Sequence, residues 1–135
     1  MRYIGKSIVG VIRLARLVFY SNELSTYSKA YALKLDEFQS RKIFVKLVRH
    51  FKLVRDGRDL ELRFFRGGGG LFSTAGFWVK INSSANLGIL CHEVAHAVDS
   101  MKRLSRHDKR FFRLIGRIVK YCENNQSIRS IVYRP

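Results

Sequence analysis

The sequence predicts an α+β fold in which a small antiparallel sheet is flanked by helices. Apolar residues recur at helical spacing early and late in the chain, whereas a short central stretch alternates apolar with polar residues as a strand does. The 135 residues, 47% of them hydrophobic, are enough for one domain with its own core. We expect residues 37–135 to form this domain and residues 1–36 to form a helical N-terminal extension.

Five helices are expected, with boundaries that follow from apolar spacing and from capping residues. They cover residues 7–20, 23–34, 37–53, 86–102 and 106–121. The third is the most regular, because Phe44, Leu47 and Phe51 fall on one face. Ser21 and Asn22 are expected to separate the first two helices.

Two strands are expected in the middle of the chain. The Asp-Gly pair at 56–57 predicts a turn, and residues 60–64 then alternate apolar with charged residues. Four glycines at 67–70 predict a flexible hairpin loop, after which residues 77–81 form the second strand. The tail at 131–133 is apolar, but its spacing indicates no particular element.

Basic residues dominate the charge. There are 26 Lys and Arg against 10 Asp and Glu, which gives a formal net charge of +16. Such an excess favours a polyanionic partner: nucleic acid, an anionic membrane surface or an acidic protein. The alternative is a solvated surface without a partner, although +16 exceeds the net charge that solubility needs.

Cysteine content and the N-terminal segment bear on location. Cys91 and Cys122 are too few for a disulfide framework, so a reducing compartment such as the cytoplasm is expected. In the apolar and basic segment 1–20, Arg13 and Arg16 interrupt the apolar run, and no small-residue cleavage site follows. The run is also shorter than the roughly 20 residues that span a bilayer. We therefore expect an amphipathic helix there, and neither a signal peptide nor a transmembrane segment.

The segment at 92–96 has the pattern His-Glu-x-x-His inside a predicted helix. His92 and His96 are four residues apart, so both imidazoles project from one side and can bind one Zn²⁺. Glu93 is the candidate catalytic base, which would take a proton from a metal-activated water. The alternatives are a chance match among surface residues and histidines buried in the core. Because the apolar stripe of this helix lies on its other side, a histidine face open to a cleft or to solvent is favoured.

A catalytic zinc has three protein ligands and one open position. His107 is the candidate third ligand, since three of the four histidines fall within sixteen residues. The chain must reverse before it, and Ser105 with Asp108 predicts the start of a second helix whose first turn holds His107. Glu123 is the alternative third ligand. Asp99, one helical turn beyond the motif, could accept a hydrogen bond from a ligand imidazole and fix its tautomer.

The motif and the later segment Arg106-His107-Asp108-x-x-Phe111 together resemble the SprT-like metallopeptidases. The resemblance covers roughly residues 37–121. It departs from the family where Asp108 replaces the usual Gly, in a short spacer before the third histidine, and in the lack of zinc-ribbon cysteines. It implies a zincin-like fold with an HExxH active-site helix, a bound Zn²⁺ and a protein or peptide substrate. Some SprT-like enzymes cleave proteins crosslinked to DNA, which agrees with the basic composition.

The same resemblance gives a role to the strand that precedes the motif helix. In zincins this strand is a sheet edge, where an extended peptide can pair and hold its scissile carbonyl over the metal. The candidate residues are Phe77, Trp78, Val79, Lys80 and Ile81. A buried middle strand is the alternative.

A basic stripe is expected on the last predicted helix. It consists of Arg106, Arg110, Arg113, Arg117 and Lys120. The stripe would either bind a phosphate backbone beside the metal cleft or be a solvated helix face. Three functions stay open on the sequence: a zinc metallopeptidase that acts on nucleic-acid-associated proteins, a nucleic-acid-binding protein with a vestigial or structural zinc site, and a basic structural component of an assembly such as a virion.

Overall fold

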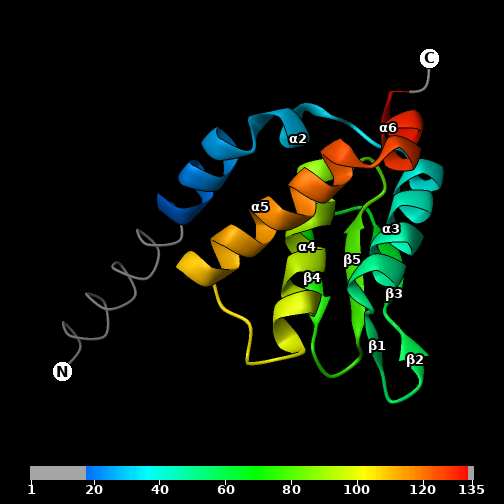
Figure 1. Cartoon of the computed structure of the whole chain (residues 1–135), viewed down its shortest axis with the longest axis vertical. Coiled ribbons are helices and arrows are strands. Elements are labelled where there is room, and N and C mark those ends of the chain that lie inside the picture. The colour runs from blue at the N-terminus through cyan, green and yellow to red at the C-terminus, as the bar shows by residue number, and fades with distance from the viewer. Residues whose placement is uncertain (1–17, 134–135) are drawn as a thin grey trace.

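Helices occupy both ends of the described chain, and short strands lie between them (Figure 1). The computed structural model describes residues 18–133, of which 18–26 are helical. The further elements are α2 (Ser28–Ala32), α3 (Glu37–Phe51), β1 (Val54–Arg55), β2 (Arg58–Asp59), β3 (Glu61–Phe65), β4 (Gly70–Ser73), β5 (Trp78–Asn82), α4 (Leu87–Ser100), α5 (Lys109–Asn124) and α6 (Gln126–Val132). This order confirms the α+β class. Over residues 18–133, none of the helices has the length and apolar character needed to cross a membrane.

The two helices that frame the strands begin at capping residues. The Asp36 side chain accepts a hydrogen bond from the Gln39 amide at 2.7 Å, and the Gln39 side chain accepts one from the Asp36 amide at 2.9 Å. At the start of α4, the side chain of Asn86 accepts from the Ile89 amide at 2.8 Å. These bonds satisfy amide groups that have no partner within the helix. As a result, α3 and α4 lie within the predicted ranges.

The main sheet is mixed rather than antiparallel, which corrects the prediction. Its strand order is β3-β5-β4, with β5 parallel to β3 and antiparallel to β4. The expectation of two strands joined by a glycine hairpin omitted β4, which starts at the last glycine of the run. This extra strand reverses the chain once more, so β5 returns in the same direction as β3.

A separate hairpin precedes this sheet. β1 pairs antiparallel with β2 across the predicted turn. Asp56 and Gly57 have φ angles of 53° and 74°, the left-handed pair that a tight two-residue hairpin turn requires. The turn predicted from the Asp-Gly pair is therefore confirmed.

The described part of the N-terminal segment, residues 18–36, packs against the rest of the described chain. Ala30 and Leu35 are buried in the common core, and the Leu87 amide bonds to the Leu33 carbonyl at 2.9 Å. Residues 18–36 thus share one core with the residues that follow, and the division of the chain at residue 36 stays a prediction. The expected break at 21–22 is wrong, because residues 18–26 form one continuous helix. Most of the predicted helix 7–20 lies outside the described residues.

α4 is the central element of the fold. It packs against α2, α3 and α5 and against β4 and β5. His92 and Glu93 are consequently only 4% and 5% exposed. Of the two expected surroundings of the histidine face, a cleft or solvent, open solvent is wrong for these two residues, whereas His96, one turn later, is half-buried.

Candidate metal centre

Three imidazole nitrogens converge at one end of the domain. The Nε2 atom of His107 lies 3.0 Å from Nε2 of His96 and 3.3 Å from Nε2 of His92. The ligand atoms of the three residues all lie within 4.8 Å of one another. A tetrahedral metal bonded to imidazoles at about 2.0–2.1 Å holds its nitrogens roughly 3.3–3.4 Å apart. Two of the separations are therefore close to those around a tetrahedral metal, and the cluster could hold a metal ion.

The three histidines differ in their exposure to solvent. His92 is buried, His96 is half-buried and His107 is exposed. A metal held here would be enclosed on the α4 side and open near His107. Three ligands with one open side is the arrangement of a catalytic rather than a closed structural site.

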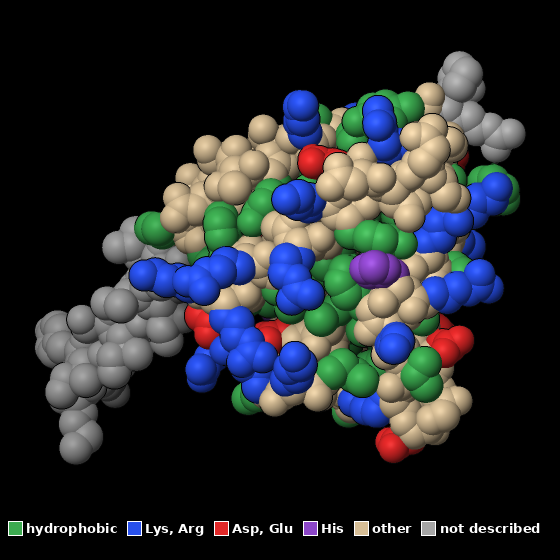
Figure 2. Space-filling view, viewed as in Figure 1, with side chains coloured by type: hydrophobic (Ala, Val, Ile, Leu, Met, Phe, Trp, Pro, Cys, Tyr) green, Lys and Arg blue, Asp and Glu red, His purple; other side chains and the backbone are tan. Residues whose placement is uncertain are grey.

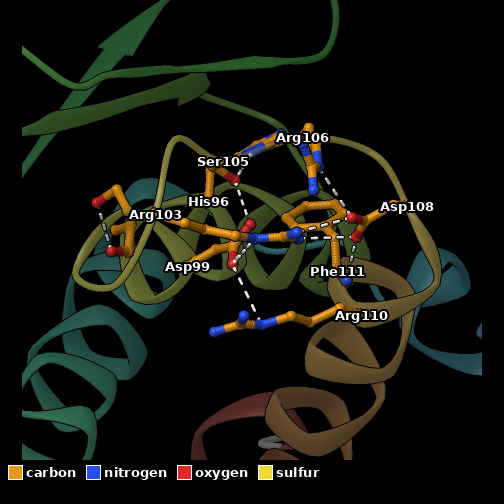
Figure 3. Close-up of polar contacts among 10 residues, drawn as sticks. His96, Asp99, Arg103, Ser105, Arg106, Asp108, Arg110 and Phe111 are labelled. Atoms are coloured by element: carbon orange, nitrogen blue, oxygen red, sulfur yellow. Dashed lines mark hydrogen bonds and ion pairs between the residues drawn. The ribbon is translucent and has the colours of Figure 1, made fainter.

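A network around Arg103 holds the loop that carries His107 (Figure 3). The Arg103 guanidinium donates to Asp99 at 2.7 Å and forms two parallel bonds, each 2.7 Å, with Asp108. Asp108 in turn accepts from the Phe111 amide at 3.0 Å and caps α5. The hydrogen bonds from Arg103 hold the pKa of Asp108 well below its usual range. The α4–α5 reversal is thus fixed on both sides of His107 by charge-assisted hydrogen bonds.

This network corrects the predicted role of Ser105. Instead of capping α5, the Ser105 hydroxyl lies 2.8 Å from Nδ1 of His96 and donates to Asp99 at 2.9 Å. Because the hydroxyl donates to Asp99, it accepts from His96 and keeps the proton on Nδ1, which leaves Nε2 free to bind a metal. α5 begins three residues later than predicted, at Lys109, and His107 lies just before its cap.

Asp99 acts on the imidazole through Ser105 rather than by direct contact. Its side chain is 3% exposed and is bonded to both Arg103 and Ser105. Burial works to raise the pKa of Asp99, but the hydrogen bonds from Arg103 and Ser105 outweigh it and hold the pKa below its usual range. The carboxylate therefore stays charged and orients the hydroxyl that faces His96.

Glu23 completes the centre, and the sequence analysis missed it. Its carboxylate is fully buried and lies 2.7 Å from Nδ1 of His92, while the Tyr31 hydroxyl donates to its other oxygen. A carboxylate behind a ligand histidine fixes the ring and raises its basicity. The available signal was an acidic residue on a buried face, because Tyr27 and Ala30 follow Glu23 at four and seven residues.

Aromatic rings cover the histidines. Tyr20 stacks on His92 at 5.9 Å between ring centroids, and Phe19 lies 5.0 Å from His107. Phe111 stacks on His96 at 4.3 Å between ring centroids. Burial raises the pKa of the Tyr20 phenol, and the Glu93 and Glu23 carboxylates raise it further. The helix of residues 18–26 thus forms one wall of the centre.

The side chain of Glu93, a residue of α4, lies against Gly70 of the edge strand β4. A Cβ atom on Gly70 would come within 2.7 Å of Glu93 Cγ and Oε2, so only glycine allows this approach. Burial raises the pKa of Glu93 to about 7, an effect that His92 opposes and Glu23 strengthens. The glycine run therefore serves a close backbone approach as well as a turn.

Ionisation also favours metal binding at His96. Burial lowers the pKa of His96 to about 3, with further lowering by His92 and His107 and an opposing effect of Asp99. The ring is therefore neutral at physiological pH. Neutral imidazole is the form that coordinates a metal.

Other predicted site residues lie elsewhere. Glu123, the alternative third ligand, is exposed near the end of α5, about 20 Å along the helix from its start. It does not belong to the histidine cluster. The proposed substrate strand 77–81 is also corrected. β5 is bonded on both sides by β3 and β4, so it has no edge free for a peptide, and Phe77 precedes the strand in a buried position.

The basic stripe is exposed along α5, where Lys and Arg side chains gather on one face (Figure 2). Arg106 differs from the other members, because it lies in the loop and pairs with Asp108 at 3.1 Å. Lys102, Arg110, Arg113 and Arg117 line a pocket of about 250 Å³ whose wall also includes Asp99. The stripe and this pocket form one cationic surface that we call the α5 basic face.

We expect Glu23→Gln to weaken metal binding about 10- to 100-fold, because the neutral amide supports the His92 ring less strongly than a carboxylate does. Competition with a chromogenic zinc chelator measures the change. Glu37→Gln makes the same charge change at an exposed helix start and should leave the affinity unaltered. Equal affinities for the two variants would contradict the assigned role of Glu23.

No protein-family model matches the sequence, and no curated protein or solved structure matches the chain. The resemblance stated from the motif therefore rests on this chain's own residues.

Proposed function

We propose that the chain is a zinc-dependent metallopeptidase of the zincin type. The observation that carries the proposal is the convergence of three imidazole Nε2 atoms, from His92, His96 and His107, with Glu93 beside them. An all-nitrogen set of three ligands with one open side suits Zn²⁺ better than Mg²⁺ or Ca²⁺, which prefer oxygen. Neither cysteine belongs to the cluster, and Cys91 and Cys122 are buried 3.9 Å from each other.

Glu93 would act as the base. Bound zinc supplies a water of lowered pKa and polarises the substrate carbonyl. Glu93 accepts one proton as the water oxygen forms a bond to the carbonyl carbon, and it delivers that proton to the amide nitrogen as the C–N bond breaks. The products are a carboxylic acid and an amine, and Glu93 returns to its starting form.

β4 is the proposed docking edge for the substrate. It pairs with β5 on one side only and packs against α4. An extended peptide that adds to this edge would lie beside Gly70, and therefore next to Glu93. The sequence predicted this role for residues 77–81, most of which belong to the central strand β5; we now propose it for β4.

Metal removal tests the proposal. Purified protein should contain one zinc per chain by elemental analysis, and it should cleave peptides in a proteome-derived mixture, with products identified by mass spectrometry. Treatment with 1,10-phenanthroline should remove zinc and cleavage together, and added Zn²⁺ should restore both. Protein without zinc, or cleavage that survives chelation, would exclude this function.

A second function, binding of a nucleic-acid backbone, is favoured by the α5 basic face. Three Arg and one Lys border the pocket there, and within residues 18–133 the acidic partner of Arg110 is the distant Asp99 at 4.0 Å. Phosphate groups match such exposed guanidinium groups. The two functions are compatible, because a protein bound to nucleic acid could be the substrate. The zinc content of the purified protein distinguishes these functions: bound zinc supports the combined function, and its absence supports a purely nucleic-acid-binding or virion role.

We expect replacement of Arg110, Arg113 and Arg117 by Gln to weaken binding of a fluorescein-labelled 20-base-pair duplex. The slope of log affinity against log salt should fall in magnitude by about 2–3, because each lost phosphate contact removes about 0.9. Fluorescence anisotropy at several salt concentrations measures both quantities. Replacement of Lys42, Lys46 and Arg49 on α3 by Gln removes the same charge elsewhere. If the α3 variant lost as much affinity for the duplex, the loss would reflect net charge alone and not the α5 basic face.

A further inference from the structure

A groove runs between the helix of residues 18–26 and the start of α5, two segments that lie side by side (Figure 1). Its volume is about 840 Å³, and its walls include Phe19, Asn22, His107 and Phe112. His107 belongs both to this wall and to the histidine cluster. The groove therefore opens directly beside the candidate metal centre.

The walls of the groove are mainly apolar. Phe19 packs edge-on against Phe112 at 5.9 Å and also contacts the ring of His107 at 5.0 Å. Val18 extends this surface and is 53% exposed. An apolar side chain that enters such a groove loses contact with water at both surfaces, which is the main source of affinity in small binding sites.

Cations stand beside the apolar walls. Lys109 and Arg113 line the groove and are exposed. Asp108, the acidic residue in the wall, is already bonded to Arg103 and Arg106. The charge that the groove offers to a ligand is therefore positive, and a carboxylate next to the apolar side chain is complementary to it.

We infer that this groove holds a large aliphatic or aromatic side chain of the peptide substrate, with an acidic residue beside it that pairs with Lys109 or Arg113. The inference rests on the proposed function, because the occupant is a peptide whose carbonyl lies at the metal. An extended peptide advances about 3.4 Å per residue. A side chain close to the cleaved bond therefore reaches a groove whose wall is a metal ligand.

Binding of two defined peptides tests the inference without cleavage. The full chain with Glu93→Gln serves as the receptor, and the probes are fluorescein-labelled Gly/Ser nonapeptides with a central Leu-Asp or a central Ser-Lys. Anisotropy should show at least about tenfold tighter binding of the Leu-Asp peptide, given the apolar area that Leu buries. Asn22→Trp fills the groove from an exposed helical position and should abolish the preference. Lys109→Glu should remove the share of this binding preference that comes from the Asp of the Leu-Asp peptide.

Two matched controls accompany these variants. Ser21→Trp adds the same ring on the same helix outside the groove walls, and Lys42→Glu makes the same charge change on α3, away from the groove and the α5 basic face. Ser21→Trp should keep the preference, and so should Lys42→Glu, because Lys42 is exposed on α3. Equal binding of the two peptides, or a preference that survives Asn22→Trp, would overturn the inference. Selective binding without any zinc or cleavage would support the groove and refute the metallopeptidase, so the two failures are distinguishable.

Discussion

Glu93→Gln is expected to lower the rate of peptide cleavage by about 10²–10⁴-fold while the protein still binds one zinc per chain. The amide keeps the shape of the carboxylate against Gly70 but cannot accept a proton. The substitution also removes a carboxylate that is only 5% exposed, so the fold should lose no stability. Single-turnover cleavage with elemental analysis of the same sample separates the loss of chemistry from the loss of metal.

Glu61→Gln is the matched control for this change. Glu61 is exposed on β3, the edge of the sheet opposite β4 and Glu93, and pairs with Arg63 at the surface. Its variant should cleave at the wild-type rate. If Glu93→Gln also did so, Glu93 would not be the base, whatever the metal content.

His107→Ala is expected to weaken zinc binding by at least about a hundredfold. Structural zinc sites with four ligands gain about 10–16 kcal/mol, so one ligand accounts for roughly 3 kcal/mol, and 1.4 kcal/mol corresponds to tenfold. His107 is exposed, so its truncation should not unfold the protein. Competition with a chromogenic chelator gives the affinity, and circular dichroism of the metal-free variant monitors the fold.

Glu123→Ala completes this experiment, because Glu123 was the other candidate for the third ligand. It lies near the far end of α5 and should leave zinc affinity unchanged. A loss of affinity in Glu123→Ala, with none in His107→Ala, would mean that the geometry of the cluster does not describe the metal-bound protein.

Local sequence signals predicted the parts of the structure that depend on neighbouring residues. The positions of α3 and α4 followed from apolar spacing along the chain, and the structure adds the caps at Asp36 and Asn86. The pairing of His92 with His96 follows from helical geometry, and the approach of His107 followed from the need for a reversal. These inferences required no knowledge of which segments meet in space.

Non-local contacts account for what the sequence analysis missed. The order of the sheet depends on β5 entering between two strands, and a four-residue strand beginning in a glycine run gives almost no periodic signal. Glu23 lies 69 residues from His92, and no spacing rule connects the two. Ser and Asp are both favoured at helix N-caps, so the local rule did not distinguish Ser105 from Asp108. Asp108 is the residue that caps α5.

The burial of Glu23 against His92 links metal binding to the docking of the N-terminal helix. The same helix leads to Tyr27, whose hydroxyl donates to the Phe112 carbonyl of α5 at 2.9 Å, across 85 residues of sequence. If zinc binds more tightly when Glu23 supports His92, then by thermodynamic reciprocity the zinc must hold this helix in place by the same factor. Without zinc, the helix of residues 18–26 would then detach more readily and expose the walls of the groove beside α5 to solvent. The availability of one ion would therefore control the docking of this helix, the groove and the folding equilibrium together.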